Sequence, residues 1–478
     1  MEYEPVIGLE VHLHLKTKTK AFCGCSTEFG NTPNTQVCPV CLGFPGSLPV
    51  FNKTALDHAI KVALALHCKV EEYTKFDRKN YFYPDLPKNY QISQYGLPLS
   101  KNGYVDISVE NNPKRIGIIR VHMEEDAGKL IHEKDLSLVD FNRSGIPLLE
   151  IVSCPDINST QEAYDYLTVL KSILEYLEVS DCDMEKGSLR CDANISLRPK
   201  DAKELGIKTE LKNMNSFKAV KDALDYEIER QSQLLKEGQA LVQETRLWDE
   251  KAQQTISMRT KEGAQDYRYF PDPDLPPFII SKEKIEEIQR ALPELPQEKT
   301  RRFMKTYGLS EYDAKILVSS KNNADYAEDC LRGFSDKDKK LVANWLIGPL
   351  AAVASASNLN ISELQVPAKN FIELVELVEK KQVISSLTGK SVLQEMAETK
   401  KTASQIIEEK NLAQISDPQS LEKEIEEVIK ENAKSVDDFK AGKANALMFL
   451  VGQAMKKTKG KANPKVVQEL LKRRLSDA

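Results

Sequence analysis

The sequence predicts an α+β fold, in which a mostly antiparallel sheet fills the N-terminal part of the chain and helices fill the remainder. Residues 1 to about 290 contain most of the glycines and nearly all of the strand-like alternation between apolar and polar residues. Later residues show apolar positions at helical spacing instead. Within the first part strands are many and helices are few, which favours α+β over a doubly wound parallel sheet.

Length and composition predict a soluble multidomain protein. A chain of 478 residues is too long for one hydrophobic core. We expect a cytoplasmic protein without membrane contact, because no apolar run approaches the ~18 residues of a membrane span and the N-terminus lacks the basic region of a secretory signal. Nine cysteines, an odd number, argue against a disulfide framework and indicate thiols or metal ligands.

Two segments of the N-terminal part alternate as strands with one apolar and one polar face. They are VIGLEVHLHL, residues 6–15, and SLRCDANISLRP, residues 188–199. We expect the apolar faces to enter the core and the polar faces to be solvated or functional. The polar faces carry Glu10, His12 and His14 in the first segment, and Arg190, Asp192, Asn194, Ser196 and Arg198 in the second.

Helical spacing predicts two helices in the same part of the chain. One covers residues 159–178 and opens with a capping box from Ser159 to Glu162, and the other covers residues 216–235. Both follow strand-like segments. We therefore expect them to flank the sheet.

The remainder of the chain is predicted to be helical, in two further domains. Two prolines in ALPELPQEKTRR, residues 291–302, mark the first boundary. A second joint is expected near residues 400–415. Helices are predicted within residues 368–381, 420–432 and 445–460. The predicted domains are residues 1–292, 293–405 and 406–478.

Charge is distributed unevenly along the chain. The net charge is −5, but residues 440–478 carry +8 and the preceding residues −13. Such asymmetry indicates a polyanion partner for the basic tail. The alternative is a lysine-rich helix whose charged face is only solvated.

Four cysteines form a Cys-x-Cys pair and a Cys-x-x-Cys pair, separated by twelve residues. They are Cys23, Cys25, Cys38 and Cys41. Two such pairs can place four thiolates around one tetrahedral Zn²⁺ ion. Four cysteines leave no position for water or substrate, so we expect a structural ion. Iron–sulfur ligation and reduced surface thiols are the alternatives.

Carboxylates on separate strands are candidates for a Mg²⁺ site. Glu10 and His12 lie two residues apart on one strand and point the same way, and Glu150 interrupts an apolar run. Mg²⁺ prefers oxygen ligands and keeps several waters. The alternative for each acidic residue is a salt bridge. Further candidates are Glu125, Asp192 and Glu210, and Glu124, Asp126 and Lys129 lie in the same segment as Glu125.

Residues 75–95 combine basic and aromatic side chains. Arg78, Lys79 and Lys88 lie among six aromatic residues, a composition suited to phosphate contact and to stacking on a base or sugar. The alternative is an aromatic-rich core loop. The sequence lacks the P-loop, dinucleotide-binding and nucleophile-elbow motifs, so a nucleotide site must be built differently.

Several segments together resemble a known family over the whole chain. They are GLEVHLHL, CPVCLGFPGSLPV, FDRKNYFYPDLPKNYQISQ, VDFNRSGIPLLEIV and YRYFPDPDLPP. With them the chain closely resembles the B subunit of the bacterial and archaeal-type tRNA-dependent amidotransferase, the GatB family. The resemblance implies a cradle-like catalytic domain followed by a helical linker and a helical tail.

The resemblance also implies an activity. Members of the family phosphorylate, with ATP, the side-chain carboxylate of glutamate on tRNA(Gln) or aspartate on tRNA(Asn), and ammonia then displaces the phosphate. By resemblance, the residues that bind Mg²⁺ are Glu10, His12, Glu125 and Glu150. Asp192 and Glu210 are assigned to cofactor binding at the same site. Lys79 and Arg190 are assigned to the nucleotide phosphates.

Partners follow from the same resemblance. Ammonia comes through a channel from an amidase A subunit, a small C subunit wraps around both, and the tail grips the tRNA. Two other functions are weighed against this one: a non-catalytic tRNA-binding scaffold of the same complex, and a zinc hydrolase whose cysteine site is open to water.

Overall fold

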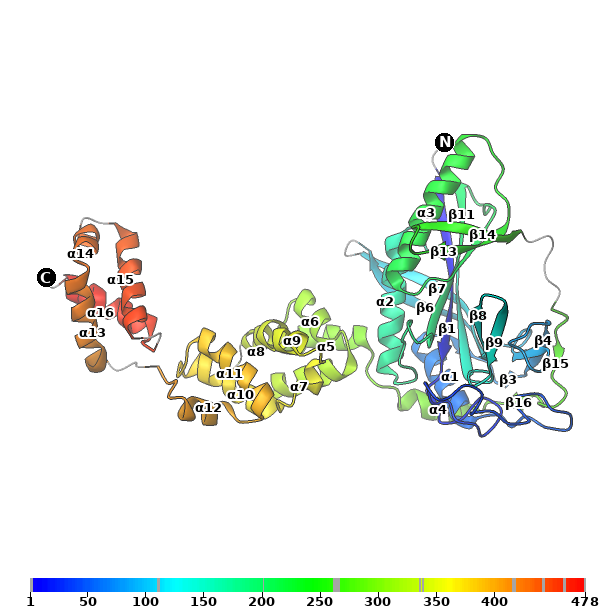
Figure 1. The fold of residues 1–478 in the computed structure, drawn as a ribbon, viewed down its shortest axis with the longest axis horizontal. Helices are drawn as coiled ribbons and strands as arrows, with labels where there is room; N and C mark the ends of the chain where they lie inside the picture. Colours follow the sequence, from blue (N-terminus) through cyan, green and yellow to red (C-terminus); the bar gives the residue numbers. More distant parts are fainter. Residues whose placement is uncertain are drawn as a thin grey trace. The chain divides into compact units, whose positions relative to one another are not determined.

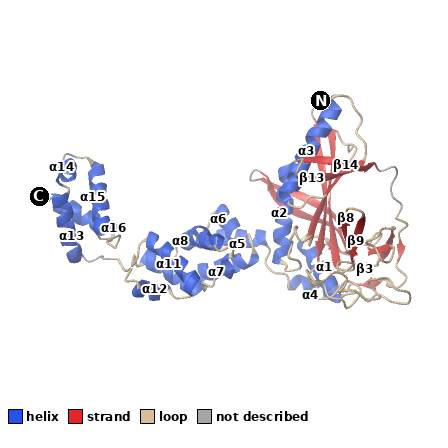
Figure 2. Cartoon of the chain, viewed as in Figure 1, coloured by secondary structure: helices blue, strands red, loops and turns tan. Residues whose placement is uncertain are grey.

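The computed structural model describes residues 3–109, 112–200, 202–260, 267–334, 337, 339–414, 418–440, 443–458 and 461–476. Contacts within the chain define two compact units, Met1–Leu295 and Pro296–Ala478. The first combines sheets with helices and the second is built from helices (Figures 1 and 2). The predicted α+β class with a helical C-terminal region is therefore confirmed, while the division of the helical part near residue 405 stays a prediction.

A nine-stranded sheet forms the centre of the first unit. Its strand order is β14-β13-β12-β11-β1-β10-β7-β6-β2, and all neighbours are antiparallel except β12 and β13. The central strand β1 lies between β10 and β11, which follow it by more than a hundred residues. The strands are β1 (Tyr3–His14), β2 (Lys69–Val70), β6 (Ser100–Val109), β7 (Asn112–Glu125), β10 (Pro147–Ser153), β11 (Leu189–Pro199), β12 (Thr209–Lys212), β13 (Glu244–Asp249) and β14 (Gln254–Thr260).

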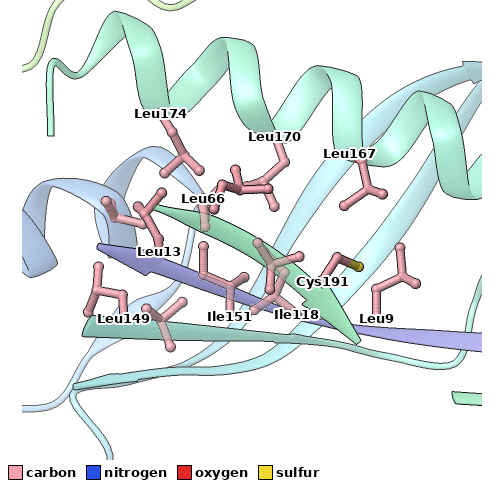
Figure 3. Close-up of a cluster of buried hydrophobic side chains, with 14 of the residues drawn as sticks. Leu9, Leu13, Leu66, Ile118, Leu149, Ile151, Leu167, Leu170, Leu174 and Cys191 are labelled. Carbon is pink, nitrogen blue, oxygen red and sulfur yellow. The ribbon is translucent and has the colours of Figure 1, made fainter. Parts of the chain in front are cut away.

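One face of this sheet is the core. The apolar residues of β1 and β11 are buried as the alternation predicts, and helices α1 (Lys53–Ala65), α2 (Thr160–Tyr176) and α3 (Phe217–Lys236) pack with the strands. Figure 3 shows Leu167 and Leu170 of α2 against the strands. Each buried leucine contributes roughly 1.5–3 kcal/mol through removal of apolar surface from water. The opposite face is thereby left for polar side chains.

Caps define the ends of α2. The Ser159 hydroxyl accepts a hydrogen bond from the backbone N–H of Glu162, as predicted, at 3.1 Å. The Glu162 carboxylate accepts from the backbone N–H of Asn158 at 2.7 Å rather than from Ser159, so the capping box is displaced by one residue. The helix ends at Tyr176, two residues before the predicted end, because Glu178 has a positive φ of 56°.

Three small sheets also belong to the first unit. The sheet β15-β4-β5 joins Phe270–Pro271 to Asp77–Asn80 and Tyr90–Ser93, so it brings the YRYFPDPDLPP segment onto the basic aromatic segment. The other pairs are β3 (Tyr73–Thr74) with β16 (Phe278–Ile279), and β8 (Lys129–Glu133) with β9 (Leu136–Asp140). Helix α4 (Lys282–Arg290) is the last element of the unit in sequence.

The second unit contains helices over the predicted segments 368–381 and 420–432 and over most of the predicted segment 445–460, of which residues 459–460 lie outside the described residues. Among the described residues, no helix combines the length and apolar character of a membrane span. The last four helices share a core that includes Leu421, Ile425 and Leu450. The elements are α5 (Pro296–Tyr307), α6 (Glu311–Leu317), α7 (Lys321–Gly333), α8 (Lys339–Trp345), η1 (Leu346–Leu350), α9 (Ala351–Ala356), η2 (Ile361–Glu363), α10 (Ala368–Val375), η3 (Glu376–Lys380), α11 (Ser386–Thr399), α12 (Ala403–Glu409), α13 (Pro418–Glu431), α14 (Ala433–Lys440), α15 (Ala444–Lys457) and α16 (Pro464–Ser476).

Candidate active site and metal centre

Strand register gathers acidic and imidazole side chains on the polar face of the central sheet. Residues directly opposite on neighbouring strands project to the same face. His12 of β1 faces Glu150 of β10, and Glu150 in turn faces His122 of β7. Glu10 of β1 faces Asp192 of β11. Side chains from four strands are therefore held side by side.

These side chains line a cavity of about 300 Å³. Six residues that sequence analysis singled out lie on its wall. They are Glu10, His12, Lys79, Glu150, Asp192 and Glu210. Glu124 is also on the wall, although sequence reasoning assigned the metal role to its neighbour Glu125. Sequence reasoning did not single out the other residues on the wall, which are Gln94, Tyr95, Arg120, His122, Lys212, Tyr267 and Tyr269.

Three of the side chains are close enough to share one ion. Ligand atoms of His12, Glu124 and Glu150 all lie within 4.8 Å of one another. His122 lies beside them, with its Nε2 atom 3.2 Å from Glu150 and 3.4 Å from Glu124. Two carboxylates beside a cavity large enough for water suit Mg²⁺, which binds few protein ligands and retains water. The residues present therefore fit this ion.

The carboxylates of the cavity differ in the direction in which their pKa values are shifted. Burial alone would raise the pKa of Glu150, but the charge of His122 and hydrogen bonds from His12 and His122 hold it well below its usual range. Burial likewise opposes protonation of His122, yet Glu150 and Glu124 raise the pKa of this imidazole to about 9. For Glu10, burial and the nearby charges of Glu150 and Asp192 raise the pKa. A cation near Glu10 would relieve this repulsion.

Glu124, rather than Glu125, belongs to this group. Glu125 is absent from the described wall of the cavity and accepts hydrogen bonds from the Lys88 ammonium at 2.6 Å and the backbone N–H of Ile92 at 2.9 Å. Side chains alternate along β7, so Glu124 shares the face of His122 and its neighbour points elsewhere. The available sequence signal was the spacing of two residues between His122 and Glu124.

Arg190 is also placed apart from the cavity wall. Its guanidinium donates to the Asp126 carboxylate at 3.0 Å, and the same carboxylate contacts His14 at 2.5 Å and Arg143 at 3.3 Å. Lys79 lies on the wall, with its ammonium 5.2 Å from the centre of the Tyr267 ring. Burial disfavours the charged lysine, but Glu124 raises its pKa above the usual value.

The four predicted cysteines converge. One sulfur atom from each of Cys23, Cys25, Cys38 and Cys41 lies within 4.8 Å of the other three. A hydrogen bond with Cys23, the backbone N–H of Cys38 and the charge of Lys20 lower the pKa of Cys41 to about 4 against the effect of burial. Four sulfurs at this spacing fit a closed tetrahedral zinc site.

The cysteine loop is fastened to the turn before β10. The Asn34 backbone N–H donates to Asp140 at 3.0 Å, and the Gln36 backbone N–H donates to Asn142 at 2.8 Å. The Lys20 ammonium donates to the Phe141 carbonyl at 3.1 Å and lies 3.7 Å from the Cys41 sulfur. Ordering of this loop therefore also supports the segment that leads into the strand of Glu150.

Comparison with known families matches most of the chain. Residues 5–286 match the model described as the GatB/GatE catalytic domain, which includes the polar cavity and the cysteine loop. Residues 325–475 match a second model, described as the GatB domain.

Curated relatives match end to end. The B subunit of the aspartyl/glutamyl-tRNA(Asn/Gln) amidotransferase from Carboxydothermus hydrogenoformans is 56% identical over 480 residues, which covers 99% of each chain. Its counterpart of the same name from Caldanaerobacter subterraneus is 57% identical over 477 residues and covers all of both chains. The counterpart from Persephonella marina is 54% identical, over 98% of this chain and 99% of the relative. The chain therefore belongs to the GatB/GatE family, as an amidotransferase B subunit.

Proposed function

We propose that the polar cavity is where glutamate or aspartate esterified to tRNA(Gln) or tRNA(Asn) is phosphorylated and then amidated. The chain is a B subunit of a multi-subunit, ATP-using ligase, and its GatB/GatE catalytic domain contains this cavity. The observation that carries the proposal is the placement of His12, Glu124 and Glu150 beside Lys79 on one wall.

The reaction needs activation because a carboxylate is a poor electrophile. In the first step a carboxylate oxygen of the aminoacyl side chain bonds to the γ-phosphorus of ATP, and the bond between that phosphorus and the ADP oxygen breaks. In the second step ammonia attacks the carbonyl carbon of the acyl phosphate. Phosphate leaves with the bonding electrons, and the nitrogen loses a proton to give the amide.

Phosphoryl transfer depends mainly on positioning and on charge neutralisation. Mg²⁺ would be held by His12, Glu124 and Glu150, and Glu10 lies two residues from His12 on the same face of β1. When bound, the ion neutralises phosphate charge. Lys79 adds a fixed positive charge to the same wall. Asp192 and Glu210 hold the Lys212 ammonium at 2.5 Å and 3.1 Å, so these two carboxylates support a cation of the wall.

Transfer of labelled phosphate tests this function. When the reconstituted complex receives γ-labelled ATP and Glu-tRNA(Gln) but no glutamine or ammonia, we expect label on the aminoacyl-tRNA. Gln-tRNA(Gln) is the matched control, because it lacks the carboxylate and should remain unlabelled. Amide formation from Glu-tRNA(Gln) without any labelled intermediate under these conditions would contradict the two-step route.

The other proposed components are a glutaminase A subunit that supplies ammonia, a small C subunit, and tRNA bound by the basic tail. What supports them is the identity of the chain as a B subunit and the excess of lysine and arginine after residue 440. Lys459 and Asp477 of this tail lie outside the described residues. Among its described cations, Lys456, Lys465, Lys472 and Arg473 are exposed.

We further propose that the cysteine cluster holds a structural zinc ion. Replacement of Cys38 by serine is expected to reduce zinc from about one ion per chain to a small fraction, because a hydroxyl is a much weaker ligand than a thiolate. Elemental analysis of purified protein measures the loss. Cys154→Ser, outside the cluster, should keep its zinc. Full zinc in the Cys38→Ser protein, or none in the wild type, would contradict the assignment.

A further inference from the structure

Arg120 is a cation on the cavity wall that sequence reasoning did not single out. It lies on β7 opposite Val152 of β10, two register positions from the facing pair His122 and Glu150. We propose that Arg120 binds an oxyanion of a substrate in this cavity, either a nucleotide phosphate or the side-chain carboxylate of the aminoacyl group. The inference rests on the proposed function and adds to it the residue that orients one substrate.

The first argument is the distribution of ion pairs on the wall. The Lys212 ammonium is already held by two carboxylates, Asp192 and Glu210. The Lys79 ammonium lies near Glu124 and over the Tyr267 ring. For Arg120, the described part of the chain contains no carboxylate within ion-pair distance of the guanidinium, although carboxylates are abundant on the same wall.

The second argument is an unsatisfied donor. The Nε atom of Arg120 is shielded from solvent and has no hydrogen-bond acceptor among the described residues. A buried N–H group without an acceptor is unfavourable, and native structures rarely retain one without a reason. A guanidinium presents several N–H groups in a planar fork, which matches the paired oxygens of a carboxylate or phosphate. A bound substrate oxyanion would supply the missing acceptor.

Other arginines around the site differ from Arg120 in this respect. Arg78 donates to Asp272 at 3.0 Å and to Asp274 at 2.8 Å. Arg190 donates to Asp126. Their guanidinium groups hold the protein together through internal carboxylates, which leaves Arg120 as the arginine of the described wall that is available to a ligand.

The position of Arg120 is suited to contact with a reacting substrate. Residues two apart on a strand lie ~7 Å from each other, so Arg120 is about this far along β7 from His122 and its neighbours. Tyr95 and Tyr269 line the same cavity, and their rings stack at 4.2 Å between centres. A substrate oxyanion at Arg120 would therefore lie in the cavity that also contains the acidic cluster and the two stacked rings.

Kinetics of the full reconstituted complex test the proposal. Arg120→Met removes the charge and the donors, and Arg120→Lys keeps the charge but loses the fork. We expect the KM for one substrate, ATP or aminoacyl-tRNA, to rise about tenfold or more, the loss expected for a charged hydrogen bond. Arg115→Met is the matched control, because Arg115 is on the same strand but is exposed and paired with Asp106.

The outcomes separate the two sources of the oxyanion. A higher KM for ATP alone assigns a phosphate. A higher KM for aminoacyl-tRNA, with unchanged binding of uncharged tRNA, assigns the side-chain carboxylate. Unchanged KM values for both substrates, or equal rises in both as expected from a distorted cavity, would overturn the proposal. If Arg120→Met does not assemble, the same readings apply to Arg120→Lys.

Failure of this inference is distinguishable from failure of the proposed function. If the wild-type complex labels Glu-tRNA(Gln) but the Arg120 variants keep both KM values, the role of Arg120 is excluded and the proposed reaction stands. If the wild-type complex forms no labelled aminoacyl-tRNA, the proposed reaction itself is excluded.

Discussion

Complexes that carry Glu150→Gln are expected to amidate misacylated tRNA at least about a thousandfold more slowly than the wild type, because charge neutralisation is a main source of catalysis in phosphoryl transfer. Glu150 lies 3.6 Å from the Nε2 atom of His12 and 3.2 Å from that of His122. Glutamine has nearly the same shape but no charge. The substitution therefore removes one proposed metal ligand and the anion beside both imidazoles.

The measurement for Glu150→Gln is the rate of Gln-tRNA(Gln) formation, with glutamine hydrolysis and tRNA binding recorded on the same preparation. These two activities should persist, since neither requires the acidic cluster. Glu4→Gln is a suitable control, because Glu4 lies on β1, the strand paired with that of Glu150, but binds Arg198 at 2.6 Å, away from the described cavity wall. Amidation by Glu150→Gln at the wild-type rate would favour the scaffold interpretation, in which another subunit performs the phosphorylation.

Local sequence patterns predicted those parts of the site that depend on a single strand or a short loop. Alternation in residues 6–15 and 188–199 separated core from polar face, and this places Glu10, His12 and Asp192 on one surface. The cysteine cluster was predictable for the same reason, since each pair of sulfurs is set by a turn of a few residues.

Residues that depend on distant contacts were not predictable in this way. Glu124, Glu125 and Asp126 are consecutive carboxylates, and only the pairing of β7 with β10 decides which of them faces His12. Arg190 does lie on a polar strand face, but its guanidinium donates to the carboxylate of Asp126, which lies 64 residues earlier in the chain. Arg120 carries no sequence signal of its own, because its distinguishing feature is the lack of a partner among the described residues of the folded chain.

Deletion of residues 415–478 is expected to weaken binding of tRNA to the complex by at least about a hundredfold at low salt, and to flatten the dependence of affinity on salt concentration. Each lysine or arginine that contacts a phosphate releases a counterion, so the slope reports how many such contacts are lost. Helices α13–α16 pack on a core of their own, so the deletion removes a whole packed cluster of helices. Affinity is measured over a series of salt concentrations with uncharged tRNA, which makes the result independent of catalysis.

A smaller change within the full chain identifies the contact surface. Lys472 and Arg473 on α16 are exposed and have no ion pair among the described residues, so Lys472→Gln with Arg473→Gln should reduce the salt slope by about 2 if both contact phosphates. The matched control is Lys401→Gln with Lys410→Gln, which removes the same charge from cations paired with Glu409 and Glu395. Equal losses in both double variants would indicate a general charge effect.

The deletion is the decisive test, because no other segment of the chain carries a comparable excess of positive charge. An unchanged affinity after the deletion would rule out the tail as the main tRNA contact.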